Sequence, residues 1–148
     1  MTASTRGFRN ADTGGMAPSC STARHLHEVY LPHFKRVVDE GVASIMSAYN
    51  SLNGEWAGQN RDLLTGILCD QWGVQGFVQS DWMFGMRDAK RAALAGQNVE
   101  MPLKNVFHRF LPDLVDNGEV PESVVDVGRY SLDEEALRRQ FTIKQSTP

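Results

Sequence analysis

Short apolar segments alternate with amphipathic helical segments along this chain, and this alternation restricts its fold more than any other feature. The segments 42–47, 76–80 and 98–101 are mostly apolar and bounded by turn residues, so they predict three strands. Apolar residues at spacings of three and four predict helices at 23–40, 61–72, 86–95, 106–115 and 121–141. Strands that alternate with helices form a parallel sheet with right-handed crossovers, so the predicted fold class is α/β.

The length of the chain sets how much of such a fold it can hold. Three strands form either a small open sheet or a slice of something larger. A complete (β/α)8 barrel of the TIM type needs roughly 250 residues, so 148 residues have room for about three of its eight units. We expect residues 1–22 to be loop or disorder, 23–141 to be the folded part, and 142–148 to be a frayed tail.

Single residues predict local breaks and caps in this pattern. Pro32 and Pro112 lie inside helical patterns, so we expect a kink or break at the first and an interruption at the second. Asn60 is suited to cap the helix that follows it. The glycine- and asparagine-containing segment 50–58 is predicted to be a loop.

Composition argues against several classes of function. The net charge is −3 and the basic residues are scattered, which gives no support for nucleic-acid binding. No apolar run approaches the roughly 20 residues of a membrane span, and no signal peptide is visible, so the compartment is unknown and cytoplasmic by default. Two cysteines and four histidines show no metal-ligand spacing, so we expect unpaired thiols, no metal and no cofactor.

The chemistry of the predicted fold would lie where its strands end. In a β/α barrel the active site is built at the C-terminal ends of the strands. The first strand delivers Met46 and Tyr49, the second Asp81 and Trp82, and the third ends at Glu100. A carboxylate beside aromatic side chains suits a sugar, because the carboxylate can attack the anomeric carbon while the indole stacks on the ring. The phenol can hydrogen-bond the carboxylate and fix its rotamer.

Each of these residues also has a purely structural interpretation. An aspartate after a strand is often a helix cap or a turn residue, and a lone tryptophan more often packs than binds. Met46 and Tyr49, taken alone, are most often core and rim residues.

Several blocks of the sequence favour the functional interpretation by their order and spacing, and from about Arg24 to Pro102 the chain resembles glycoside hydrolase family 3, the β-glucosidase family. The blocks are Arg24 to Phe34, Ile45 to Asn50 with Asn53-Gly54, Asn60 with Leu63-Leu64, Trp72 to Trp82, and Ala95 to Pro102. The resemblance implies that the chain is the C-terminal part of the family's N-terminal barrel.

The resemblance also implies roles for individual residues. Asp81 is expected to be the nucleophile, because it stands where the family has the aspartate of its Ser-Asp-Trp triplet. Met46, Tyr49 and Trp82 are expected to line the glucose subsite. A tryptophan after the nucleophile is similar to the glucosidase branch, so the expected activity is retaining hydrolysis of terminal β-D-glucosides, with a β-glucoside or an oligosaccharide as substrate.

Departures and absences qualify that expectation. Cys69 and Val74 stand where the family usually has Arg and Phe, which suggests relaxed packing behind the second strand. Asn98 replaces an aspartate, which would remove a carboxylate from the rim. The family's upstream sugar-binding block and its acid/base glutamate are not found in this chain, so we expect the chain alone to be inactive.

Two hypotheses from different classes remain. The first is an enzyme part whose parent is a β-glucosidase. The second is a diverged remnant without catalysis that serves, if at all, as an interaction or scaffold protein. In either case the open edges of a partial barrel predict self-association.

Overall fold

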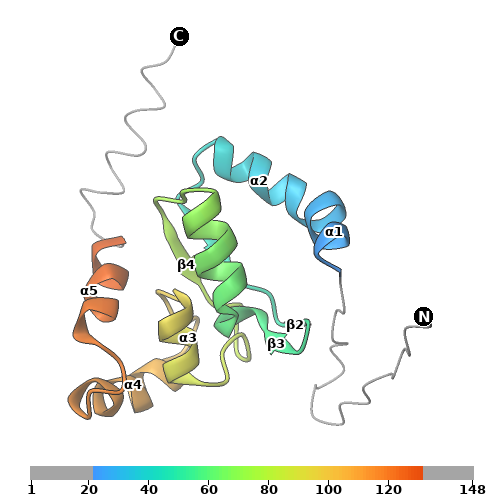
Figure 1. The fold of residues 1–148 in the computed structure, drawn as a ribbon. Coiled ribbons are helices and arrows are strands. Elements are labelled where there is room, and N and C mark those ends of the chain that lie inside the picture. The colour runs from blue at the N-terminus through green and yellow to red at the C-terminus, as the bar shows by residue number, and fades with distance from the viewer. Residues whose placement is uncertain (1–21, 132–148) are drawn as a thin grey trace.

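A computed structural model describes residues 22–131 (Figure 1). The expected loop at 1–21 and the expected tail at 142–148 lie outside the described residues, as does the last helix beyond Ser131. Within the described part, helices surround a small parallel sheet, which confirms the α/β class. No helix in residues 22–131 is both long enough and apolar enough to cross a bilayer.

The first helical segment changes type at the proline. It comprises α1 (Ala23–His25), the π-helical η1 (Leu26–Tyr30) and α2 (Leu31–Asp39). Pro32 lies in the first turn of α2, directly after the π-helical segment. The break expected at Pro32 is thus a change of helix type just before it.

The sheet joins segments far apart in sequence. Strands β1 (Ser44–Met46) and β4 (Phe77–Gln79) pair in parallel, with Ile45 opposite Val78. The third predicted strand is reduced to one parallel bridge, between Gln79 and Val99. The predicted parallel arrangement is therefore confirmed, with shorter strands than the apolar segments suggested.

The segment expected to be a loop contains a hairpin. Strands β2 (Ser51–Leu52) and β3 (Glu55–Trp56) pair in antiparallel fashion. Asn53 and Gly54 connect them with φ of 52° and 91°, and positive φ at both positions is what a tight two-residue hairpin turn requires. The 3₁₀ helix η2 (Ala57–Gln59) follows directly.

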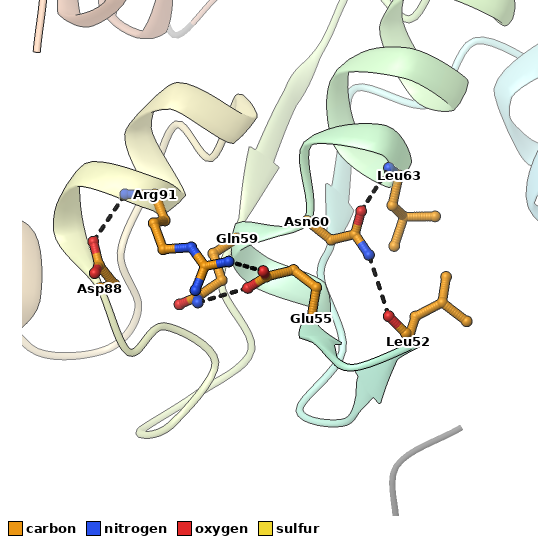
Figure 2. Close-up of polar contacts among 7 residues, drawn as sticks. All are labelled: Leu52, Glu55, Gln59, Asn60, Leu63, Asp88 and Arg91. Carbon is orange, nitrogen blue, oxygen red and sulfur yellow. Dashed lines mark hydrogen bonds and ion pairs between the residues drawn. The ribbon is translucent and has the colours of Figure 1, made fainter. Parts of the chain in front are cut away.

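Side chains cap two of the helices that flank the sheet. Asn60 precedes η3 (Asp62–Gln71) and accepts a hydrogen bond from the Leu63 amide at 3.1 Å, as expected of an N-cap (Figure 2). Its amide nitrogen donates to the Leu52 carbonyl at 3.5 Å, which ties the cap to the hairpin. Asp88 caps α3 (Ala89–Ala95). The helix therefore begins at residue 89, whereas the sequence predicted a start at residue 86.

Two helices complete the described part. The helix α4 (Val106–Asp116) continues through Pro112, so the predicted interruption is wrong. A proline removes one helical hydrogen bond, and α4 retains the packing of its neighbouring turns against α3. The helix α5 (Glu122–Ser131) follows and contacts α3 as well.

The core lies between the sheet and the helices. Leu64 and Leu68 of η3, Val78 of β4 and Ala95 of α3 form its centre. Partly buried apolar side chains surround them, namely Val38, Ile45, Leu63, Trp72 and Val74. This core fixes η3 and α3 against β4, the strand that leads to Asp81.

Candidate active site

Asp81 follows β4 after one buried residue, Ser80. The Ser80 hydroxyl accepts a hydrogen bond from the Met101 amide at 2.9 Å, which binds the end of β4 to the neighbouring segment. Asp81 is half-buried, and one of its carboxylate oxygens accepts from the Trp82 amide at 2.7 Å. The Gly85 amide donates to the Asp81 carbonyl at 3.1 Å, closing a turn over residues 81–85. The predicted placement of Asp81 at the strand end is confirmed.

Tyr49 reaches this turn from the segment after β1. Its hydroxyl accepts a hydrogen bond from the Met83 amide at 3.0 Å. The expected bond from the phenol to the Asp81 carboxylate is not formed, and one oxygen of that carboxylate accepts from the Trp82 amide. Tyr49 therefore contacts the backbone two residues after Asp81, and it orients the turn rather than the carboxylate itself.

Gly58 of η2 packs against Gly85, the last residue of the turn. A Cβ on Gly58 would lie 2.1 Å from the Gly85 carbonyl oxygen, and one on Gly85 would lie 2.2 Å from the Asp81 carbonyl oxygen. Real Cβ atoms do not approach so closely, so both positions need glycine. Sequence reasoning missed this pair. A glycine four residues after Asp81 was the only signal for it.

Several apolar side chains at these strand ends and in the turn are exposed. Met46 at the end of β1 is 49% exposed and Trp82 is 52% exposed. Met83 and Phe84, in the same turn as Trp82, are similarly exposed. Met46 thus ends β1, and Tyr49, Asp81 and Trp82 follow the C-terminal ends of the two paired strands, as predicted.

Glu100 does not join this group. Its carboxylate accepts hydrogen bonds from the amides of Asn105, Val106 and Phe107, at 3.2, 2.6 and 2.9 Å. Three amides at the start of α4 hold this carboxylate, which also interacts favourably with the helix dipole. Glu100 lies at the end of the third strand segment, as predicted, but its side chain caps α4.

Asn98 also has a structural position. Its side-chain oxygen accepts a hydrogen bond from the Val78 backbone amide at 2.7 Å, and its backbone amide donates to the Val78 carbonyl at 2.9 Å. The residue therefore binds the third strand segment to the middle of β4, away from the strand end. The expectation that Asn98 removes a carboxylate from the rim is wrong, because the side-chain oxygen of residue 98 bonds the backbone of β4.

A polar network joins the hairpin to the helix after the turn. Figure 2 shows Arg91 of α3 pointing toward Glu55 of β3, with which it forms an ion pair. The second Glu55 oxygen accepts from the side-chain amide of Gln59 at 2.7 Å, and Gln59 is buried. Since Gln59 directly follows Gly58, this network fixes the segment that packs against Gly85.

An arginine covers the hairpin tryptophan nearby. The Arg87 guanidinium carbon lies 4.4 Å from the centre of the Trp56 ring and 5.9 Å from that of Phe84. Its Nε also donates to the Phe84 carbonyl at 3.2 Å. Among residues 22–131, no three His, Cys, Asp or Glu side chains gather as metal ligands.

Comparison with known proteins assigns the chain to the β-glucosidase-like glycoside hydrolases. Residues 6–129 match the family described as "Glycosyl hydrolase family 3 N terminal domain". The chain belongs to glycosyl hydrolase family 3.

Individual relatives share only part of their length with this chain. A β-glucosidase of Rhizobium radiobacter is 45% identical over 80 residues, which are 53% of this chain and 10% of the relative. A probable β-glucosidase E of Emericella nidulans is 47% identical over 98 residues, which are 64% of this chain and again 10% of the relative. The chain thus spans about a tenth of the length of these curated relatives.

Solved structures agree with the fold. A family 3 β-glucosidase of Bifidobacterium adolescentis superposes with a TM-score of 0.73 at 31% identity, covering 88% of this chain and 19% of that one. A β-glucosidase of Streptomyces venezuelae, solved in complex with D-glucose, superposes with a TM-score of 0.74 at 31% identity, covering 88% of this chain and 18% of that one.

Proposed function

We propose that this chain carries the nucleophile of a retaining β-glucosidase and that Asp81 is that nucleophile. The observation that supports it best is the position of Asp81. This residue follows a central parallel strand and begins a turn that Tyr49 contacts at the Met83 amide and Gly58 contacts at Gly85. A reacting group held by rigid elements meets the geometric demand of a displacement reaction.

The proposed reaction is a double displacement. A carboxylate oxygen of Asp81 forms a bond to the anomeric carbon of a β-glucoside as the bond to the aglycone oxygen breaks. The aglycone takes a proton from a second carboxyl group, which we do not assign to any of residues 22–131. Water then gives a proton to the carboxylate so formed and attacks the same carbon, the aspartyl ester breaks, and glucose leaves with its β configuration retained.

The surrounding side chains take supporting roles in this proposal. Tyr49 positions the turn through the Met83 amide, while Met46 and Trp82 line the sugar subsite with exposed apolar surface. The chain forms about the last three β/α units of a TIM-type barrel, and alone it is inactive because retaining hydrolysis needs two carboxyl groups. No observation favours the non-catalytic remnant over this function.

A graft into a relative tests the proposal. The segment of the Rhizobium radiobacter β-glucosidase that matches this chain is replaced by residues 23–116, and the hybrid is treated with a 2-deoxy-2-fluoroglucoside. We expect a covalent adduct that peptide mass mapping places on Asp81, and Asp81→Asn should prevent it. Glu100→Gln is the matched control and should keep the adduct. A label on another residue, or an α-anomer as first product, would contradict the assignment.

A further inference from the structure

The hairpin strand β3 and the helix α3 meet at an ion pair. Arg91 lies in the first turn of α3, where its backbone amide donates to the capping side chain of Asp88 at 2.9 Å, and its guanidinium pairs with Glu55 (Figure 2). At the other end, Glu55 accepts a hydrogen bond from the buried side chain of Gln59 at 2.7 Å. Both members of the pair are therefore held in place by a second contact.

A second arginine joins the same two segments. Arg87 lies four residues before Arg91, and its guanidinium covers the ring of Trp56, which follows Glu55 in β3. Its Nε donates to the carbonyl of Phe84, within the turn over residues 81–85. Both residues of β3 thus contact an arginine from the segment that follows this turn.

Different parts of the fold hold the two ends of the turn. Its start follows β4 and the buried Ser80. Its end, Gly85, lies against Gly58 and is followed closely by the cap of α3. Since Gly58 comes soon after β3, the distance between the hairpin and α3 determines where the end of the turn lies.

The ion pair is not what attaches α3 to the fold. Buried alanines anchor this helix, namely Ala92, Ala93 and Ala95. A partly exposed ion pair changes a folding equilibrium by at most about fivefold. Lys90, the neighbour of Arg91, forms a comparable pair with Glu119 at 2.9 Å. The same helix therefore carries one ion pair to the hairpin and another to the segment between α4 and α5.

We propose that Glu55 and Arg91 are positioning residues for the reaction proposed above, because their pair sets the hairpin against α3 and thereby the turn that begins at Asp81. Glu55 acts on the end of the turn through Gln59 and Gly58. The pair determines the position of the carboxylate and makes no contact with the sugar. Its effect on the turn is a property of this chain, whereas its effect on the reaction rests on the proposed role of Asp81.

Hydrogen exchange in the full 148-residue chain tests the effect on the turn. The Gly85 amide, which donates to the Asp81 carbonyl, reports on the turn, and the Val78 amide reports on the sheet. Glu55→Gln keeps an acceptor for Gln59 and removes only the charge, and Arg91→Gln removes the opposite charge. Each should speed exchange at Gly85 by about three- to fivefold, the effect of one such ion pair, and leave Val78 within about twofold.

Lys90→Gln is the matched control and should change neither rate of exchange. Because both variants remove the same pair, Glu55→Gln combined with Arg91→Gln should exchange at Gly85 no faster than either alone. Arg91→Lys keeps the charge and should restore most of the protection. Equal acceleration at Gly85 and Val78 would mean that the pair stabilises the whole chain, and it would overturn the proposal. So would unchanged exchange at Gly85, or an acceleration that Lys90→Gln reproduces.

Trapping kinetics in the hybrid enzyme test the effect on the reaction. The graft is extended to residues 23–129 so that it includes Glu119, and the 2-deoxy-2-fluoroglucoside yields a dissociation constant and a rate constant for adduct formation. Glu55→Gln and Arg91→Gln should each lower the rate constant about tenfold and leave the dissociation constant within about twofold, since positioning rather than binding is lost. Lys90→Gln should leave both constants unchanged.

The two measurements separate this proposal from the assignment of the nucleophile. An unchanged rate constant on Asp81, or a loss that falls on the dissociation constant instead, would overturn the positioning role. An adduct on another residue contradicts the nucleophile and with it the effect on the reaction. Faster exchange at Gly85 alone would in that case still support the part of the pair in holding the turn.

Discussion

The hydroxyl of Tyr49 accepts a hydrogen bond from the backbone amide of Met83, across a distance of 3.0 Å. Tyr49 follows β1 and Met83 follows β4, so the bond joins the ends of two paired parallel strands. It fixes the turn that begins at Asp81 without engaging the carboxylate. The phenol can therefore influence the reaction only through the position of the turn.

Replacing Tyr49 with Phe removes this acceptor and keeps the ring. Because Met83 is exposed, water can replace the hydroxyl, and we expect urea unfolding to show a loss of only about 0.5–1 kcal/mol. In the hybrid enzyme kcat should fall up to about tenfold with KM within about twofold, since positioning rather than binding is lost. Tyr30→Phe is the control and should change neither stability nor kcat. An unchanged kcat in Tyr49→Phe would remove the positioning role.

Substitution of Glu100 should reduce stability, because its carboxylate caps α4. Glu100→Ala leaves three amides at the start of α4 without their acceptor and should cost about 1–2 kcal/mol of stability. Glu28→Ala, which removes an exposed ion pair with Arg24, should cost at most about 0.5 kcal/mol. Thermal and urea unfolding compare the two. Equal losses would mean that the α4 cap is not formed in solution.

Cys69 should react slowly with alkylating reagents. Cys69 lies at the surface, yet partial burial of its thiol raises the pKa, and the nearby Asp70 carboxylate raises it further. The thiol is then protonated at neutral pH, and only the thiolate reacts. In a Cys20→Ser variant, iodoacetamide labelling should be slower than for free glutathione at pH 7.5 and rise about tenfold per pH unit below the pKa.

The raised pKa of Cys69 also makes the stability of the chain depend on pH. The folded chain holds the Cys69 proton to higher pH than the unfolded chain does, so the unfolded state loses its proton first. Stability should therefore decline as pH rises above about 8.5, the usual thiol pKa, through the raised value of the folded state. Cys69→Ser should flatten that decline. Labelling as fast as glutathione at pH 7.5 would contradict the raised pKa.

The sequence indicated the parts of the fold that depend on local pattern. Val78 and its neighbours form a short apolar run that can only be a buried strand, and Asp81 had to follow its end. Asn60 could be recognised as a cap because the helical spacing begins directly after it. The hairpin was missed although Asn53-Gly54 is a strong turn signal, because its strands are too short to show alternation.

Other features depend on contacts that no local pattern encodes. Glu100 turns toward the first amides of α4, and nothing in the order of residues distinguishes this from a carboxylate at the rim. Arg91 meets Glu55 only because α3 and the hairpin pack side by side. Pro112 was expected to interrupt α4, yet the helix continues through it with the loss of one helical hydrogen bond.

The isolated chain provides a prediction about activity. We expect the 148-residue protein to show no turnover of an aryl β-glucoside above background, because general acid catalysis alone contributes about 10²–10⁴-fold and the proposed mechanism finds no general acid among residues 22–131. The Asp81→Asn variant is the negative control in this assay. Turnover that this substitution abolishes would show that the chain is an enzyme by itself.

The close approach of Gly58 to Gly85 leads to the sharpest test of how the turn is held. A methyl group on Gly58 would meet the Gly85 carbonyl oxygen at 2.1 Å, and Gly85 in turn lies against the backbone of Asp81. Gly58→Ala must therefore displace the turn, with a loss of about 1–3 kcal/mol in urea unfolding, the usual cost of overpacking. In the hybrid enzyme the displaced Asp81 should lower kcat by up to about 100-fold.

Gly66 in η3 is the matched control for this substitution. The atom nearest to a Cβ on Gly66 is 3.9 Å away, an ordinary contact, so Gly66→Ala should fit without displacement. It should stabilise the chain by about 0.5–1 kcal/mol, since alanine loses less backbone entropy in a helix, and it should leave kcat unchanged. If Gly58→Ala behaves like Gly66→Ala in both measurements, η2 does not pack against the turn, and the position of Asp81 depends on β4 and Tyr49 alone.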